Sequence, residues 1–187
     1  MLTRLKEFSL QLNVEKCVLA QSSVQFSGYY IDASGYKPLP SKVKAIEEFP
    51  QPDTIQKLMR FLGMINFYRN SIPHAAEILQ PLNKHLVSVK RKDNRPVQWD
   101  EESLEAFRAA KQAIAAAASL ALPNENASIR IVMDASDTSM AGAFEQKEAN
   151  DWFPLAFFSH KFNNAQAKYS TYDRELTAVV ESIKYFQ

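Results

Sequence analysis

The sequence contains a single cysteine, Cys17, among its 187 residues. One cysteine excludes a disulfide bond within the chain and is typical of a protein in a reducing compartment. Glycine is also scarce, with only four residues, and none of them belongs to a glycine-rich phosphate loop. The Cys/His spacing of a zinc site and a Ser/His/Asp nucleophile set are absent as well. The sequence therefore predicts none of these three kinds of site.

Long hydrophobic runs are missing. The longest apolar stretch, residues 113–122, is mostly alanine and is too short to span a bilayer. Residues 1–12 are charged and amphipathic, and they lack the pattern of a signal peptide. We therefore expect no membrane among the partners of the chain.

Neither sign of charge is in excess, since the net charge is only +1. The distribution is uneven, however: residues 1–95 carry 14 Lys and Arg against 8 Asp and Glu, and residues 96–187 carry 8 against 13. A basic first half suits contact with phosphates, and an acidic second half suits cations. The same split can also arise by chance among solvated faces.

What the sequence does contain is a set of strand patterns, one of which ends on a carboxylate. Residues 129–134 alternate between two faces as a half-buried strand requires, and this strand ends at Asp134. Further strands are predicted at residues 140–146 and 152–159. A carboxylate at a strand end is held rigidly, as a catalytic or metal site requires. The alternative is a turn aspartate that hydrogen-bonds its own backbone.

A helix is predicted at residues 171–186, with Ser170 as its N-cap. Its apolar residues repeat at helical spacing and form one stripe, which we expect to be buried: Tyr172, Leu176, Val179, Val180 and Ile183. Glu175 falls on or beside this stripe, where a carboxylate is costly unless it is paired or binds a metal. The alternative is a glutamate that leans into water and is favoured by the helix dipole.

These residues resemble a known family. The stretches DASDTSMAGAFEQ and PLAFFSHKFNNAQAKYSTYDRELTAVVESIKYF are similar to the start of the ribonuclease H (RNase H) domain in gypsy-like long-terminal-repeat retrotransposons. The resemblance implies that Asp134 and Glu175 are catalytic and are the first two ligands of a site for Mg²⁺, or Mn²⁺. The family usually has Gly at position 141 and Ala at position 142. Ala141 and Gly142 reverse this order, which could shift the turn between the two strands.

The first forty residues predict strands at 16–20 and 24–31 around a polar turn at 21–23, and a second turn at 32–35. Gly28 interrupts the second strand, which indicates a bulge or a close backbone approach. An ordinary hairpin with core aromatics is the alternative. LNVEKC and FSGYYI resemble the end of the reverse transcriptase palm with its primer grip. This resemblance implies that Gly28 and Tyr29 contact nucleic acid.

A helical region follows. Helices are predicted at residues 41–49 and, after the N-cap Thr54, at 55–70; further helical turns are predicted at 75–79 and 81–86, with Pro81 at a first helical position. Gly63 in mid-helix costs about 1 kcal/mol against Ala, so it indicates close helix packing or close approach of a ligand. The stretch LMRFLGMINFYRNSIPHAAEILQPL resembles the thumb of the same reverse transcriptases.

The thumb resemblance implies that basic side chains of this region are available for the phosphates of a duplex: Lys57, Arg60 and Arg69. A solvated helix face is the alternative for each of them. Residues 88–96 form a charged linker, which is the predicted domain boundary. Asp100 caps a helix at residues 101–119, which we expect to support the sheet that begins at residue 128.

The sequence therefore predicts an α+β fold. We expect residues 1–40 to end the palm with a primer-grip hairpin, 41–95 to form a helical thumb, and 96–127 to connect it to the next domain. Residues 128–187 should form the first part of an RNase H-like domain, with an incomplete antiparallel or mixed sheet and a helix.

The function implied by the resemblance is that of an internal segment of a retrotransposon Pol polyprotein. The complete enzyme would bind RNA–DNA hybrids and primer–template duplexes and hydrolyse the RNA strand with Mg²⁺. This chain alone is expected to be inactive, because further aspartates of that site should follow Gln187 and the polymerase aspartates should precede Met1. A non-catalytic nucleic-acid-binding or structural remnant is the alternative. The expected location is the cytoplasm, within a retrotransposon particle, or the nucleus.

Overall fold

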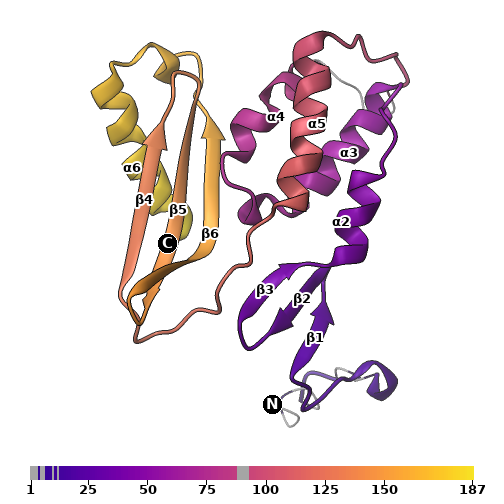
Figure 1. Ribbon diagram of the computed structural model, residues 1–187, viewed down its shortest axis with the longest axis vertical. Coiled ribbons are helices and arrows are strands. Elements are labelled where there is room, and N and C mark those ends of the chain that lie inside the picture. The colour runs from indigo at the N-terminus through magenta and orange to yellow at the C-terminus, as the bar shows by residue number, and fades with distance from the viewer. Residues whose placement is uncertain (1–3, 5–6, 10, 12, 88–92) are drawn as a thin grey trace.

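The computed structural model describes residues 4, 7–9, 11, 13–87 and 93–187. The predicted α+β fold is confirmed: two separate three-stranded antiparallel sheets accompany a helical bundle. Figure 1 shows the first sheet below the bundle and the second sheet beside it, with the last helix against the second sheet. Most of residues 1–12, and residues 88–92 of the predicted linker, lie outside the described residues.

The first sheet is formed by two tight turns. Its antiparallel strands are β1 (Ser23–Phe26), β2 (Tyr29–Asp32) and β3 (Gly35–Pro38). Ser27 and Gly28 form the first turn with φ of +46° and +83°, the left-handed conformation that two-residue hairpins favour. The prediction of one strand at 24–31 was therefore wrong, because Gly28 turns the chain instead of bulging it.

The predicted strand at residues 16–20 was also wrong. The chain there has a short 3₁₀ helix, η1 (Val14–Lys16), followed by residues without strand pairing. The predicted turn at 32–35 is confirmed, since the Asp32 carboxylate accepts hydrogen bonds from the Ser34 backbone N–H and hydroxyl. Apolar residues that favour β-structure indicated a strand at residues 16–20. A strand must pair with another strand, however, and β1 pairs with β2 instead.

The bundle contains α2 (Pro40–Glu47), α3 (Ile55–Phe67), the 3₁₀ turn η2 (Arg69–Ser71), α4 (Ala75–Lys84) and α5 (Glu101–Ala115). The predicted N-caps are confirmed: Thr54 accepts from the Lys57 N–H, and Asp100 forms a capping box with Ser103. Pro81 lies inside α4, so the predicted break there was wrong. The buried neighbours Leu79 and Leu82 hold the helix together across the missing hydrogen bond.

Helix α5 belongs to the core of the bundle. Phe107, Ala110 and Ile114 are buried in the same apolar cluster as Leu58 and Phe61 of α3, and the rings of Phe61 and Phe107 lie 4.6 Å apart. Our expectation that this helix supports the second sheet was therefore wrong. The sequence indicated the helix and its cap, but it did not indicate which part of the protein the helix packs against.

The second sheet pairs β4 (Ile129–Ala135), β5 (Ser139–Glu148) and β6 (Asp151–Lys161) in this order. After the 3₁₀ turn η3 (Gln166–Lys168), helix α6 (Thr171–Phe186) packs on one face of this sheet. The core there is a small separate cluster around Met140, Phe158 and Ala178. None of the helices in the described part of the chain has the length and hydrophobicity that crossing a membrane requires.

The segment after α5 joins the two sheets. Tyr36 of β3 exchanges two backbone hydrogen bonds of 2.8 Å with Leu120, and its hydroxyl donates to the Leu155 carbonyl of β6 at 3.1 Å. The next residue, Ala121, donates its N–H to the Pro154 carbonyl.

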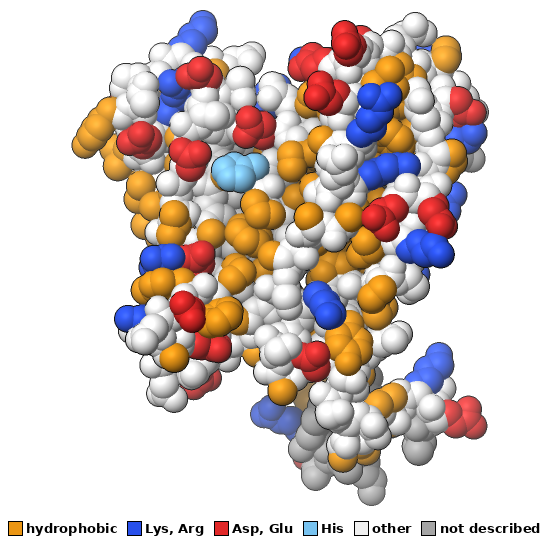
Figure 2. All heavy atoms as spheres, viewed as in Figure 1, with side chains coloured by type: hydrophobic (Ala, Val, Ile, Leu, Met, Phe, Trp, Pro, Cys, Tyr) orange, Lys and Arg blue, Asp and Glu red, His pale blue; other side chains and the backbone are white. Residues whose placement is uncertain are grey.

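Figure 2 shows hydrophobic side chains gathered in the middle of the visible face of the molecule, between the second sheet and the bundle, with charged side chains around them.

Candidate functional site

Asp134 is the penultimate residue of β4. Its cross-strand neighbour is Ala141 of β5, and the neighbour of Ala141 is Ser159 of β6. Because directly paired residues share a face of a sheet, these three residues form one row on the same face. Gly142, the next residue along β5, faces the other side of the sheet, toward Ser182 of α6. Asp134 therefore lies on the face of the sheet opposite to α6, in the edge strand of the described sheet.

Glu175 comes from the second turn of α6, and the structure brings it to Asp134. The two residues line one hollow of about 160 Å³, together with Met133, Ala135 and Ala178 among others. Figure 1 shows α6 beginning beside β4, at the edge of the sheet. Glu175 can therefore meet a residue of the opposite face around that edge. Both side chains are exposed, so the hollow is open to water.

The predicted burial of the α6 stripe was wrong. Tyr172 is 74% exposed and Leu176 is 50% exposed, and Val180 and Ile183 are exposed as well. The face that packs on the sheet instead carries the small buried residues Ala178 and Ser182. The placement of Glu175 on a buried stripe was wrong for the same reason, since its residue is exposed. The helical period was correct, but the apolar face is not the face that meets this sheet.

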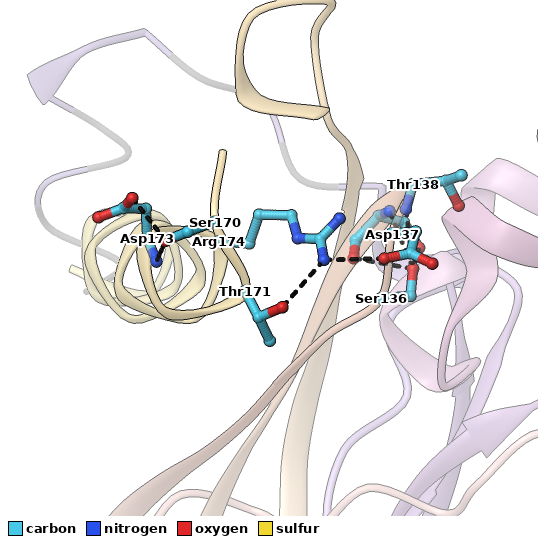
Figure 3. A network of polar contacts seen from close by, with 8 residues as sticks. Ser136, Asp137, Thr138, Ser170, Thr171, Asp173 and Arg174 are labelled. Atoms are coloured by element: carbon cyan, nitrogen blue, oxygen red, sulfur yellow. Dashed lines mark hydrogen bonds and ion pairs between the residues drawn. The ribbon is translucent and has the colours of Figure 1, made fainter. Parts of the chain in front are cut away.

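A polar turn links Asp134 to α6. After β4, the Ser136 hydroxyl accepts hydrogen bonds from the backbone N–H groups of Thr138 and Ser139. The Asp137 carboxylate in this turn forms an ion pair of 2.8 Å with the Arg174 guanidinium. The Arg174 side chain is only 13% exposed. In Figure 3 the Arg174 guanidinium points from α6 across to Asp137, with Thr171 beneath it. Arg174 directly precedes Glu175, so this ion pair connects the helix that carries Glu175 to the turn that follows Asp134.

Gly142 allows α6 to lie close to the sheet. A Cβ atom at this position would be 3.0 Å from the Ser182 Oγ, which is a tight contact. Ala141 and Gly142 both lie in β5, beyond the turn at residues 136–139. We had expected the reversed order of Ala141 and Gly142 to shift the turn, but both residues lie outside it. The reversed order places the residue without a side chain under the helix.

The donor set of the hollow suits a hard cation in kind. Carboxylate oxygens and an open, hydrated position are what Mg²⁺ prefers. The number of ligands is small: no group of three or more His, Cys, Asp or Glu residues that could hold a metal is present among the described residues. Asp134 and Glu175 together thus fit part of a metal site.

A second concave region lies between the first sheet and the bundle. We call it the α2–α3 groove; it measures about 550 Å³. Its lining combines apolar surface with two exposed cations and comes from the β1–β2 turn, α2 and α3: Ser27, Gly28, Lys42, Ala45, Ile46, Arg60, Gly63, Met64, Phe67 and Tyr68. Arg60 and Gly28 had been predicted as nucleic-acid contacts. Lys42 and Phe67 had not, although Phe67 follows Arg60 and Gly63 at helical spacing.

Among the described residues, none lies against the Cβ position of Gly63. A Cβ atom built there meets nothing within 4 Å, so close helix packing does not explain a glycine in the middle of α3. The other explanation given by the sequence, the close approach of a ligand, stays a prediction. Phe67, one turn further along α3, is 52% exposed at the same groove.

Gly28 and Tyr29 are held by the aromatic residues that end α3. A Cβ on Gly28 would lie 2.9 Å from the Tyr68 hydroxyl, which donates to the Gly28 carbonyl at 3.1 Å. The Tyr29 ring packs against Tyr36, Phe67 and Tyr68, and burial raises the pKa of Tyr29 above its ordinary value. Its hydroxyl donates to the Phe67 carbonyl. The role of Tyr29 in binding stays a prediction, and the contacts seen are internal.

The two remaining predicted contacts differ in their surroundings. Lys57 is exposed on α3 and pairs with Asp53 at 2.7 Å, a hydrogen bond that lowers the pKa of Asp53. Arg69 is not free: its guanidinium donates to the Ser159 carbonyl of β6 at 2.6 Å. Lys57 and Arg69 as nucleic-acid contacts stay predictions, but the Arg69 side chain already has a partner in the second sheet.

Comparison with known proteins decides the family. Residues 99–187 match the RNase H-like domain found in reverse transcriptase. The chain is 30% identical over 188 residues to a retrovirus-related Pol polyprotein from transposon opus of Drosophila melanogaster. This alignment covers 97% of the chain and 19% of that relative. The chain is a reverse transcriptase/RNase H-like segment of a retrotransposon Pol polyprotein. The predicted resemblance is thereby confirmed.

This Pol segment is similar to other transposon proteins over its whole length. It is 31% identical over 187 residues to the transposon Tf2-3 polyprotein of Schizosaccharomyces pombe, covering 100% of the segment and 14% of that relative. The segment thus spans less than a fifth of the length of either relative.

Two solved structures share the fold of the Pol segment. The foamy viral protease-reverse transcriptase dRH in complex with ds DNA matches with a TM-score of 0.77 and 22% identity, over 90% of this chain and 29% of that chain. The foamy viral protease-reverse transcriptase in complex with RNA/DNA hybrid matches with a TM-score of 0.77 and 23% identity, over 91% of this chain and 23% of that chain. At this identity the likeness concerns the fold alone.

Proposed function

We propose that this Pol segment holds an RNA–DNA hybrid or a primer–template duplex in the α2–α3 groove. In the complete enzyme it also supplies two carboxylates, Asp134 and Glu175, to a Mg²⁺-dependent site that hydrolyses the RNA strand. The observation that carries this proposal is the meeting of these two residues, from a strand and a helix, in one hollow. The fold neighbours described as complexes with ds DNA and with RNA/DNA hybrid support the choice of ligand.

The groove supplies the contacts for the duplex. Lys42 and Arg60 stand on opposite helices and neutralise phosphates, which gives affinity without sequence preference. Gly63 leaves room for sugars or base edges to reach the backbone of α3, and the exposed ring of Phe67 offers an apolar surface beside them. A surface of this kind recognises a duplex by shape and charge.

The hollow supplies part of the chemistry. When bound there, Mg²⁺ would supply the activation of a water and the stabilisation of the leaving oxygen. Asp134 and Glu175 would each offer carboxylate oxygens as ligands, on a strand and a helix that the ion pair of Arg174 and Asp137 ties together. Two close divalent ions repel each other and need several carboxylates. We therefore expect the 187-residue chain to bind hybrids without cleaving them.

A second candidate function is binding without any hydrolysis in the parent protein. The specific observation in its favour is that the α2–α3 groove is complete within the described residues, whereas the hollow gathers only two acidic residues. A non-catalytic segment would keep the groove and would not depend on Asp134 or Glu175. The cleavage experiment below separates the two candidates.

Binding is tested with fluorescently labelled RNA–DNA hybrid and the 187-residue chain. We expect affinity to fall steeply with salt, and Lys42→Gln or Arg60→Gln each to reduce the slope of log K against log salt by about one. Lys84→Gln is the matched control, because Lys84 pairs with Glu102 away from the groove. No binding at low salt, or an affinity that does not depend on salt, would contradict the proposal.

Hydrolysis is tested with a longer chain that continues through the rest of the domain. We expect it to cleave the RNA strand of a hybrid only with Mg²⁺ or Mn²⁺, and Asp134→Asn or Glu175→Gln to abolish cleavage while hybrid binding remains. The 187-residue chain is measured in parallel. Full activity in Asp134→Asn would show that the active site lies elsewhere.

A further inference from the structure

Ser159 lies where the second sheet meets the bundle. Its residue is only 6% exposed. Its hydroxyl accepts a hydrogen bond of 2.9 Å from the Ala76 backbone N–H, and its carbonyl accepts one of 2.6 Å from the Arg69 guanidinium. One residue of β6 thus holds both η2 and α4 of the bundle.

The contact at Ala76 replaces a missing helix cap. The N-cap of α4 is His74, whose side chain makes no capping hydrogen bond and whose φ of +53° is unusual for a residue with a side chain. The first N–H groups of a helix need acceptors. Because Ser159 supplies one of them, the second sheet completes part of the beginning of α4.

Ser159 also lies in the row of Asp134. Asp134 pairs with Ala141, and Ala141 pairs with Ser159, so the candidate metal ligand and the contact with the bundle are two strands apart on one face. Neighbouring strands are about 4.8 Å apart. A shift of Ser159 against the bundle would therefore carry Asp134 with it.

The other side of the contact leads to the groove. Arg69 follows Phe67 by two residues, and Phe67 lines the α2–α3 groove. The groove, Arg69, Ser159 and Asp134 thus form a short continuous path. A second hydrogen bond runs parallel to it, from the Tyr185 hydroxyl of α6 to the Asn70 side chain at 2.9 Å.

Apolar packing does not fix this relationship by itself, because the buried clusters of the bundle and of the second sheet are separate. An interface without a shared buried cluster permits relative motion unless specific bonds hold it. We infer that Ser159 is a positioning residue that sets the spacing, along a bound duplex, between the α2–α3 groove and the Asp134–Glu175 hollow. This inference rests on the proposed duplex binding.

The test measures that spacing directly in the 187-residue chain. Cys17, which is exposed, is replaced by Ser, and cysteines are introduced by Asn66→Cys beside the groove and Thr138→Cys in the turn after Asp134. Both positions are exposed. An iron–EDTA group attached to each cysteine cleaves nucleic acid nearby without the enzyme's own chemistry. On an internally labelled hybrid, the length of the fragment between the two cuts reports the spacing wherever the protein sits.

With Ser159 intact we expect one narrow fragment length. Ser159→Ala, and Tyr185→Phe in the parallel bond, should broaden the distribution at least twofold or move its centre by one base pair or more, since one base pair corresponds to about 3.4 Å. Ser159→Thr keeps the hydroxyl and should restore the narrow fragment. Ser182→Ala is the matched control, because it removes a buried serine hydroxyl that faces Gly142 of β5 and has no hydrogen-bond partner among the described residues.

The outcomes separate the inference from the function on which it rests. Absence of any localised cutting by the Asn66→Cys chain would refute duplex binding in the groove. Cutting by Asn66→Cys alone, with no defined fragment from the double variant, would overturn the positioning role. The same narrow fragment in a folded Ser159→Ala chain, with folding checked by circular dichroism, would also overturn it, and would leave duplex binding in place.

Discussion

The guanidinium of Arg174 lies 2.8 Å from the carboxylate of Asp137. This ion pair joins the residue before Glu175 to the turn three residues after Asp134, so it spans the two elements that carry the candidate metal ligands. The partners differ in environment, since Arg174 is mostly buried and Asp137 is 88% exposed. The two ends of the contact should therefore respond differently to substitution.

We expect Asp137→Ala to lower the free energy of unfolding of the 187-residue chain by less than about 1 kcal/mol, as exposed ion-pair partners do. Arg174→Ala should cost more, about 2 kcal/mol, because the buried stem of the side chain also loses its packing. Urea unfolding of both variants and of the double variant measures the two costs and their coupling. Equal costs for the two single variants would contradict this assignment.

Gly63→Ala should separate stability from binding. The added methyl group meets open space, so the helix propensity of Ala should raise the free energy of unfolding by roughly 0.5–1 kcal/mol. The same methyl group should obstruct a duplex in the groove and weaken hybrid binding roughly tenfold, which is about 1.4 kcal/mol. Thermal unfolding and a hybrid titration test the two effects. Asn66→Ala, on α3 outside the groove lining, is the control; tighter binding by Gly63→Ala would exclude a close approach at this glycine.

Gly142 and Ser182 should be energetically coupled. Gly142→Ala brings a methyl group to 3.0 Å from the Ser182 Oγ, and we expect a loss of about 1 kcal/mol, as for mild overpacking. Ser182→Ala removes a buried hydroxyl that has no hydrogen-bond partner in the described part of the chain, so it should be neutral or stabilising. The double variant should be more stable than the sum of the single effects. Strict additivity in urea unfolding would show that the helix is not this close to β5.

The cap of α5 should make stability depend on acid pH. The Ser103 side chain, and then its backbone N–H, lower the pKa of Asp100 by hydrogen bonding. A carboxylate whose pKa is lower in the folded state stabilises the protein above its unfolded pKa of about 4. That contribution is lost as the pH falls through the lower folded pKa.

Asp100→Ala should therefore melt at a lower temperature than the natural sequence at pH 7, and the difference should shrink steadily below about pH 4. Thermal unfolding followed by circular dichroism over this range measures the difference. Asp151→Ala at the β5–β6 turn serves as a comparison for loss of an acidic residue outside a helix cap. A difference that is unchanged in acid would mean that the carboxylate does not act through its charge.

Local signals in the sequence were sufficient for most elements. Helix α6 begins and ends where its period and its Ser170 cap predict, and Thr54 and Asp100 cap α3 and α5 as expected. These features are determined within one or two turns of chain, because capping and side-chain periodicity involve neighbours in sequence. The hairpin at Gly28 was missed because a run of apolar and aromatic residues hid a two-residue turn.

The sequence by itself thus determined the strand and the helix that carry the two candidate carboxylates, and the family that the chain resembles. Only the tertiary structure decided which face of α6 meets the sheet, that α5 packs in the bundle, and that Arg69 binds Ser159 instead of standing free. It also decided that Gly63 opens onto a groove. The reason is physical: a periodic pattern defines a face, but the partner of that face comes from a distant part of the chain, and its identity depends on the path of the whole backbone.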